Sequence, residues 1–197
     1  MEQHALGILD ARKSGSRTGG PSFSLQHRMV RAAWAVAWML LAGWTPAPLH
    51  RWRAMLLRMF GAQLAANARV HGSARIWYPP NLVMEENALI GPRVICYAMA
   101  PIRICRNAVI SQGAHLCAGS HVVDDPYFQL EAHPITIGAN AWVAAEAFVG
   151  PGVSLEEGSV LGARGVAFSN IPAWTIFAGN PARFLRKRVL FTSPGRS

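Results

Sequence analysis

The chain has 197 residues, of which 51% are hydrophobic and 15% are charged. This length suffices for one domain with a sizeable core, and the apolar content excludes an intrinsically disordered protein. The three cysteines, Cys96, Cys105 and Cys117, include no Cys-x-x-Cys pair, so neither a disulfide framework nor a structural zinc site is indicated. We therefore expect reduced thiols and a cytoplasmic protein.

The net charge of +9 is concentrated at the two ends of the chain. Residues 1–60 carry eight Arg or Lys against two acidic residues, residues 61–182 carry six against eight, and residues 183–197 carry five against none. The basic residues are not interleaved with aromatic residues as in nucleic-acid-binding modules, so we expect no nucleic-acid partner. The distribution favours contact with cofactor phosphates or with an anionic membrane surface.

The first 27 residues contain several Gly and Ser residues and predict a mobile tail. They lack the apolar core and the cleavage site of a signal peptide. This agrees with a cytoplasmic location, and a position at the inner face of the membrane stays open.

Residues 28–61 predict an apolar and basic helical lead-in. The uncharged stretch 32–44 predicts a helix that prolines then stop, and residues 50–60 predict a second helix. In the second helix the stripe that we expect to be buried consists of Trp52, Met55, Leu56 and Met59. The first helix is too short to span a membrane, which needs about 20 residues. Two hypotheses remain for residues 28–60: packing on the protein or a neighbouring subunit, and peripheral contact with a membrane.

A six-residue period organises residues 62–169. Aliphatic or small residues recur at every sixth position in three runs, with small residues four positions later. This period fits neither a 3.6-residue helix nor a simple strand, but it fits a hexapeptide coil. We therefore expect an all-β triangular prism. The residues expected at its axis are Met84, Ile90, Cys96, Ile104, Ile110, Leu116, Ile137, Val143, Val149, Leu155, Leu161 and Ala167.

The largest break in this period is the loop 122–134, which follows His121. An insertion at a corner leaves neighbouring turns stacked, so such a break marks a candidate functional loop. His121 stands at the rim of the loop, where it is well placed to meet a substrate held against the coil. Three loop carboxylates are candidates to fix its imidazole tautomer: Asp124, Asp125 and Glu131. A solvated corner histidine is the alternative interpretation.

Residues 170–197 predict a C-terminal extension. Within it, residues 184–190 predict a short basic helix whose Leu185 and Val189 face the coil. The predicted fold is thus a hexapeptide-repeat prism with helices at its N-terminal end and a short helix at its C-terminal end.

Several motifs of the coil together resemble one known family. They are Gly119-Ser120-His121, Asp125-Pro126, Pro134-Ile135-Thr136-Ile137-Gly138, Ala141-Trp142-Val143, Val149-Gly150-Pro151-Gly152-Val153, Gly162-Ala163 and Ala178-Gly179-Asn180-Pro181-Ala182-Arg183. With them the chain resembles the hexapeptide-repeat acetyltransferases, in particular the maltose, galactoside and nodulation-factor enzymes and those of colanic-acid and exopolysaccharide biosynthesis. The resemblance covers residues 28–190. It implies a left-handed parallel β-helix, an exception to right-handed crossovers, assembled as a homotrimer.

The resemblance also implies a chemistry. It implies an O-acetyltransferase that uses acetyl-CoA and no metal, and that acts on a saccharide in exopolysaccharide biosynthesis. The basic and apolar N-terminal part of the chain favours a lipid-linked or membrane-proximal saccharide as the acceptor. His121 matches the general base of a direct transfer from the thioester to the sugar hydroxyl. The residues implied to bind the cofactor are Trp142, Ala145, Ala163, Arg183 and Lys187.

Two positions depart from the family pattern. Val122 follows the histidine where a polar residue is expected, and Ser169 replaces a lysine near the phosphates. Two alternative functions remain open: an N-acyltransferase on a nucleotide sugar, and a non-catalytic β-helix scaffold. A metal enzyme like the γ-class carbonic anhydrases is disfavoured, because His115 and His121 are six residues apart where that family pairs two histidines five apart.

Overall fold

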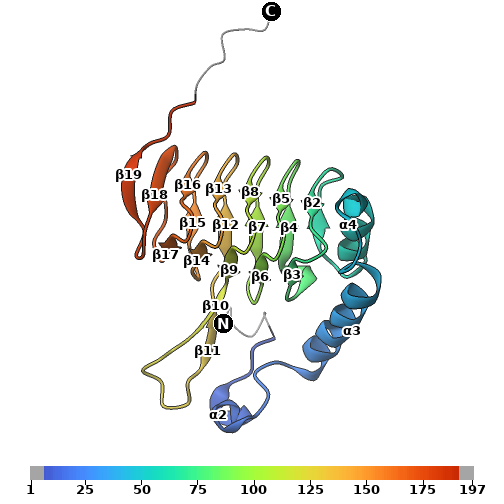
Figure 1. Ribbon diagram of the computed structural model, residues 1–197. Helices are drawn as coiled ribbons and strands as arrows, with labels where there is room; N and C mark the ends of the chain where they lie inside the picture. The colour runs from blue at the N-terminus through green and yellow to red at the C-terminus, as the bar shows by residue number, and fades with distance from the viewer. Residues whose placement is uncertain (1–6, 191–197) are drawn as a thin grey trace, which may run out of the picture.

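The computed structural model describes residues 7–190, without the side chain of Thr18. Its centre is a triangular prism of short parallel strands, with helices at one end (Figure 1). This is the predicted left-handed parallel β-helix. Within residues 7–190 no helix is long and apolar enough to cross a membrane.

Each side of the prism is one sheet of stacked strands. The first side contains β1 (Gln63–Leu64), β4 (Leu82–Met84), β7 (Ile102–Ile104), β12 (Ile135–Ile137) and β15 (Ser154–Leu155). The second side contains β2 (Arg69–Val70), β5 (Leu89–Ile90), β8 (Val109–Ile110), β13 (Trp142–Val143), β16 (Val160–Leu161), β18 (Thr175–Ala178) and β19 (Arg183–Lys187). The third side contains β3 (Arg75–Ile76), β6 (Ile95–Tyr97), β9 (His115–Cys117), β14 (Phe148–Val149) and β17 (Val166–Ala167). One further antiparallel hairpin, β10 (Gly119–His121) with β11 (Leu130–Ala132), leaves the prism after β9.

The axis of the prism is filled by the residues that the six-residue period predicts. Every predicted axis residue, from Met84 to Ala167, is at most 2% exposed. Burial of one such aliphatic side chain stabilises the fold by about 2 kcal/mol. The small residues four positions later, among them Ala108 and Ala141, are buried as well, because the narrow interior has little room beside the large side chains.

A ladder of asparagines follows one corner of the prism. Asn67 donates to Asn87 Oδ1 at 2.7 Å, Asn87 donates to Asn107 at 3.0 Å, and Asn107 donates to Asn140 at 3.1 Å. Asn87, Asn107 and Asn140 have positive φ angles near 57°, which asparagine tolerates better than most residues. The ladder continues across the β10–β11 insertion, so the insertion does not disturb the stacking of the turns.

Helix α3 (Leu25–Leu41) packs on the first turns of the prism through its tryptophans. Ser24 caps its N-terminus by accepting from the His27 N–H at 3.4 Å. Trp34 Nε1 donates to the Ile76 carbonyl at 2.6 Å, and Trp38 Nε1 donates to the carbonyls of Gly72 and Ala74 at 3.1 Å. The helix therefore packs on its own protein, as one of the two hypotheses predicts, and its opposite face is exposed.

Helix α4 (His50–Met59), which follows the short helix η2 (Ala47–Leu49), turns a different face inward from the one predicted. Its buried residues are Arg53, Ala54, Leu56 and Leu57, whereas Trp52, Met55 and Met59 of the predicted stripe are exposed. The cause is Arg53, whose guanidinium donates to the carbonyls of Val70, Pro46 and Ala47 at 2.7 to 2.9 Å. These carbonyls have few other donors, so the arginine is held inside.

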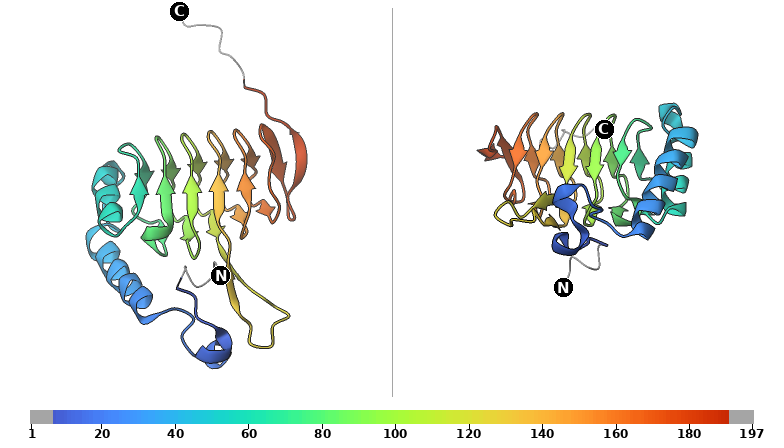
Figure 2. Two further views of the ribbon diagram at one scale, coloured as in Figure 1. Left: turned by 180° about the vertical axis from the view of Figure 1, so that it is seen from behind. Right: turned by 90° about the horizontal axis from the view of Figure 1, so that it is seen from below.

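The N-terminal arm, residues 7–24, is not the mobile tail that the sequence predicts. It contains α2 (Ala11–Ser14) and η1 (Ser16–Thr18), and it lies beside the tip of the β10–β11 hairpin (Figures 1 and 2). Gln129 of the hairpin accepts from the Ala11 N–H at 2.7 Å and donates to the Leu9 carbonyl at 3.2 Å. Ile8 and Phe23 pair and are buried. The part of the prediction that concerns residues 1–6 lies outside the described residues.

The predicted C-terminal helix is also wrong. Residues 183–187 form β19, which pairs antiparallel with β18, and β18 continues the second side of the prism. Leu185 and Val189 are exposed and do not face the coil. The open edge of β18 offers unpaired backbone groups, and pairing with it satisfies more hydrogen bonds than a two-turn helix would.

Candidate active site

His121 lies at the end of β10, where the hairpin leaves the prism. In the hairpin it stands opposite Leu130. The close approach of the hairpin to the prism requires Gly119, because a Cβ atom there would lie 2.1 Å from the Met99 sulfur. The base of the hairpin is therefore held at one place on the coil, and His121 lies two residues beyond it.

The His121 ring is held by Phe128 on the returning side of the hairpin loop. His121 Nδ1 lies 2.9 Å from the Phe128 carbonyl oxygen, and the two rings stack with centroids 4.2 Å apart. A carbonyl oxygen only accepts, so Nδ1 carries the proton and Nε2 presents a lone pair. This is the tautomer that a general base needs at Nε2.

The three carboxylates expected to orient His121 have other roles. Asp125 accepts from the Tyr127 N–H at 2.8 Å, and Glu131 lies 3.4 Å from His133 Nε2. Within residues 7–190 neither they nor Asp124 makes a hydrogen bond or an ion pair with His121. The prediction of a carboxylate partner is therefore wrong for the described chain, and a backbone carbonyl takes its place.

A cavity of about 450 Å³, which we call the His121 cavity, lies beside this histidine. Its walls come from the N-terminal arm, from α3, and from the third side of the prism. Residues that the sequence did not single out line it: Arg28, Arg31, Trp77, Tyr97 and Met99. The spacing of Arg28 and Arg31, three residues apart on a helix, was the available signal that they share a face.

Two other histidines lie outside this cavity. His115, which is half-buried, packs edge-on against Phe148, and burial lowers the pKa of its imidazole. Its Nε2 is buried and has no hydrogen-bond partner in the described chain. His27 is stacked between Phe23 and Tyr78. Neither histidine faces the cavity that His121 lines, so both are poorer candidates for contact with a substrate.

A second cavity, on the second side of the prism, brings together three of the residues predicted to bind the cofactor. This groove has a volume of about 510 Å³ and is lined by Trp142, Ala145 and Ala163, with Arg186 and Arg188 at the C-terminal end. Trp142 is 44% exposed and donates from Nε1 to Ser111 Oγ at 2.8 Å, which fixes its ring as a wall of the groove.

The groove offers free backbone donors. The N–H groups of Ala145 and Ala163 make no hydrogen bond within residues 7–190, although the Ala145 carbonyl accepts from Arg164 N at 2.9 Å. Both donors lie in the groove that Trp142 borders. Such donors suit the amide carbonyls of an extended ligand or a developing oxyanion.

Two of the basic residues that were predicted to bind the cofactor lie outside the groove. Arg183 and Lys187 lie exposed on β19 and do not line the groove, whereas Arg186 and Arg188 do. Arg188 is fixed there, because it donates to the carbonyls of Asn140 and Gly158 at 2.8 and 2.9 Å.

Within one chain the predicted site residues form two groups. The hairpin strand β10, which carries His121, leaves the prism after β9 of the third side, whereas β13, which carries Trp142, belongs to the second side (Figure 1). No cluster of three or more His, Cys, Asp or Glu side chains suited to a metal ion lies in the described chain.

Comparison with known proteins gives consistent similarities. A family model described as the hexapeptide repeat of succinyl-transferase matches residues 82–118 and 134–166. The chain is 42% identical over 160 residues to the colanic acid biosynthesis acetyltransferase WcaF of Escherichia coli K12, a match that covers 81% of this chain and 87% of that protein.

Two solved structures share the fold. The maltose O-acetyltransferase of Clostridium difficile 630 superposes with a TM-score of 0.74 at 22% identity, over 85% of this chain and 90% of that one. The hexapeptide-repeat acetyltransferase VCA0836 of Vibrio cholerae, in complex with acetyl-CoA, superposes with a TM-score of 0.76 at 19% identity, over 95% of this chain and 98% of that one.

Proposed function

Because this chain belongs to the hexapeptide-repeat acetyltransferase family, we propose that it transfers the acetyl group of acetyl-CoA to a saccharide hydroxyl, with His121 as the general base. The observation that carries this proposal is the hydrogen bond from His121 Nδ1 to the Phe128 carbonyl, which leaves Nε2 available as a base beside a cavity. The name of the WcaF relative supports a saccharide acceptor from exopolysaccharide biosynthesis.

The transfer is a single displacement at the thioester. His121 Nε2 takes the proton of the acceptor hydroxyl while the hydroxyl oxygen forms a bond to the acetyl carbon. The carbon–sulfur bond then breaks, CoA leaves as the thiolate, and the proton on the imidazole returns to the sulfur. The Phe128 carbonyl stabilises the imidazolium by holding Nδ1–H throughout.

Acetyl-CoA occupies the groove on the second side of the prism. Trp142 covers the pantetheine arm, and the unpaired N–H groups of Ala145 and Ala163 donate to its amide carbonyls or to the thioester oxygen. The basic strand β19, with Arg183, Arg186 and Lys187, meets the CoA phosphates through charge-assisted hydrogen bonds.

The active site forms between two chains of a homotrimer. His121 and the Trp142 groove lie on different sides of one prism, so a catalytic centre that uses both needs a neighbouring chain. Association of three prisms around a threefold axis would place the third side of one chain against the second side of the next.

The test is a thiol-release assay with acetyl-CoA and a panel of sugars, oligosaccharides and nucleotide amino sugars. We expect His121→Ala to lower the rate about a hundredfold or more while CoA binding and the oligomeric state persist. His133→Ala, which removes an exposed histidine of the same insertion, serves as the matched control and keeps its rate. Equal rates in His121→Ala and the unmodified protein would refute the assignment of the base, and transfer to amino sugars alone would refute O-acetylation.

A further inference from the structure

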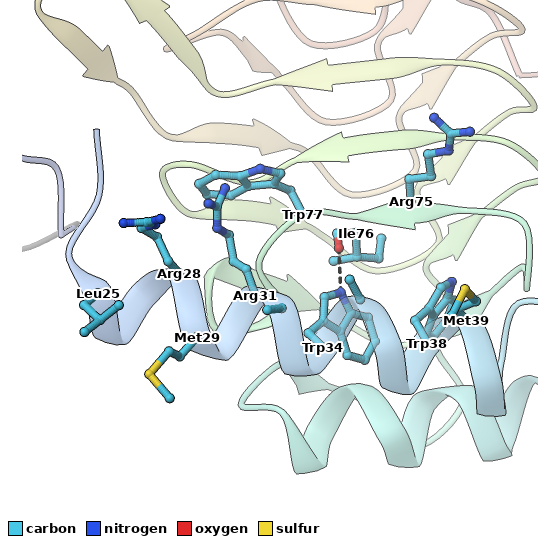
Figure 3. Close-up of a pocket in the computed structure, with 12 residues that line it drawn as sticks. Leu25, Arg28, Met29, Arg31, Trp34, Trp38, Met39, Arg75, Ile76 and Trp77 are labelled. Atoms are coloured by element: carbon cyan, nitrogen blue, oxygen red, sulfur yellow. Dashed lines mark hydrogen bonds between the residues drawn. The ribbon is translucent and has the colours of Figure 1, made fainter. Parts of the chain in front are cut away.

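An apolar groove along α3 joins the His121 cavity. Its volume is about 730 Å³, and Figure 3 shows that α3 and the first turns of the prism supply its residues. The apolar part is lined by Leu25, Met29, Trp34, Trp38 and Met39. Arg28, Arg31 and Trp77 line both the groove and the His121 cavity, so the two spaces meet at these three side chains.

The junction carries positive charge that nothing in the described chain neutralises. The Arg31 guanidinium lies 4.3 Å from the centroid of the Trp77 ring and 5.4 Å from that of Phe23. Arg31 Nε is buried and has no hydrogen-bond partner among residues 7–190. Neither Arg28 nor Arg31 forms an ion pair with an acidic residue of the described chain, and burial followed by the charge of Arg28 lowers the pKa of Arg31.

The chemistry of this junction fits a phosphate. Two arginines three residues apart on one helix face, of which Arg31 is held over Trp77, offer several donors to the oxygens of a phosphate or diphosphate. An anion there would also give the buried Nε of Arg31 its missing acceptor.

The order of the three spaces defines the ligand. The apolar groove leads to the cationic junction, and the junction leads to the polar cavity that contains the base. A phosphate-linked glycolipid has its parts in the same order: a lipid tail, a phosphate and a saccharide. We propose that the α3 groove binds the lipid of a phosphate-linked glycolipid, that Arg28 and Arg31 bind its phosphate, and that the saccharide thereby reaches His121. This inference rests on the proposed function, whose acceptor it specifies.

The first test measures binding of three small probes to the full chain by calorimetry. Octyl phosphate has the tail and the anion, octyl glucoside has a tail without charge, and inorganic phosphate has the anion alone. We expect octyl phosphate to bind at least about tenfold more tightly than either of the others. Equal affinity for octyl phosphate and inorganic phosphate would overturn the proposal.

Variants separate the two halves of the site. Arg28→Gln, a change at an exposed side chain, lowers the affinity for octyl phosphate about tenfold and leaves the affinity for octyl glucoside unchanged. Arg69→Gln is the matched control and changes neither affinity. Ala35→Trp fills the groove and lowers the affinity for octyl phosphate but not for inorganic phosphate. If Ala35→Trp instead breaks the oligomer, the groove belongs to a subunit contact and the proposal fails.

Further outcomes identify the source of the lipid and separate this inference from the proposed function. A polyprenyl phosphate displaces octyl phosphate, whereas displacement by phosphatidylglycerol vesicles alone would assign the groove to bulk lipid and overturn the inference. Acetyl transfer to free sugars that octyl phosphate does not inhibit would keep the proposed function and overturn the lipid-linked acceptor. Octyl phosphate binding without acetyl transfer to any acceptor would keep the groove and overturn the proposed function.

Discussion

His27 makes the attachment of the N-terminal arm sensitive to acid. Its ring is stacked between Phe23 of the arm, at 4.6 Å, and Tyr78 of the prism, at 4.1 Å. Neither ring nitrogen has a hydrogen-bond partner in the described chain. Burial, and next the charge of Arg31, lower the pKa of His27 from 6.5 to about 4. The folded protein therefore holds this imidazole neutral at pH values where the unfolded chain protonates it.

The sign and size of the effect follow from this shift. Above pH 6.5 His27 is neutral in both the folded and the unfolded state, so it does not change the free energy of unfolding. As the pH falls from 6.5 to about 4, the unfolded state binds a proton at His27 before the folded state does, and the free energy of unfolding decreases. A pH of about 5 lies about 1.5 pH units below the pKa of 6.5 in the unfolded chain and still above the pKa of about 4 in the folded protein, so the loss of stability at that pH is about 2 kcal/mol. His115, whose pKa is also lowered by burial, adds a loss of the same sign.

Urea unfolding at about pH 7.5 and about pH 5 measures this loss in the unmodified protein, in His27→Phe and in the control His50→Gln. Phenylalanine keeps the stacking and removes the titration, so His27→Phe should lose about 2 kcal/mol less than the unmodified protein between the two pH values. The comparison cancels the contribution of His115, which all three proteins share. The same pH dependence in His27→Phe and the unmodified protein would refute the reasoning.

Three further predictions concern the groove, the lead-in and the outer helix face. Trp142→Ala should raise the KM for acetyl-CoA about tenfold with a smaller change in kcat, while Phe168→Ala, an exposed aromatic outside the groove, should not. Arg53→Ala should lower the free energy of unfolding by about 3 kcal/mol because several buried carbonyls lose their donor, whereas Arg51→Ala on the exposed face of α4 should be nearly neutral in thermal unfolding. We also propose that the exposed apolar face of α3 and α4 contacts an anionic membrane, so the double variant Leu40→Ser, Met59→Ser, which leaves the α3 groove unchanged, should sediment less with anionic liposomes, and equal partition would contradict this.

The axis of the prism could be predicted from the sequence because its signal is local and repeated. Each turn places Ile104, Val143 or Leu161 in the same environment, so the period of six appears in the chain itself. The position of the inserted loop could also be predicted, because an insertion at a corner of the prism appears as a break in that period. His121 was found by this route, at the point where the repeat stops.

The contacts that the sequence did not give are those between distant segments or with the backbone. The partner of His121 is a carbonyl group, which any residue at position 128 would supply, so no side-chain pattern marks it. The docking of the N-terminal arm depends on Gln129, more than 100 residues away, and composition alone made the arm look mobile. In residues 184–190 the spacing of Leu185 and Val189 fitted a helix. The local spacing contains no information about the open edge of β18, with which this segment pairs.

The two parts of the candidate site differ in how much of each is built from the six-residue repeat. The Trp142 groove is built from the repeat itself, with Ala145 and Ala163 on successive turns, so its geometry is fixed by the stacking of the prism. The His121 cavity combines segments outside the repeat, which are the hairpin, the N-terminal arm and α3, with Trp77, Tyr97 and Met99 from the third side of the prism. The hairpin is tied to the coil at its base, where Gly119 packs against Met99 and the Ala118 N–H donates to the Tyr97 carbonyl at 3.1 Å. Changes in the arm or in α3 can therefore alter the acceptor while the Trp142 groove stays intact, and for this reason we propose that the N-terminal segments, together with the third side of the prism, set the specificity for a lipid-linked saccharide.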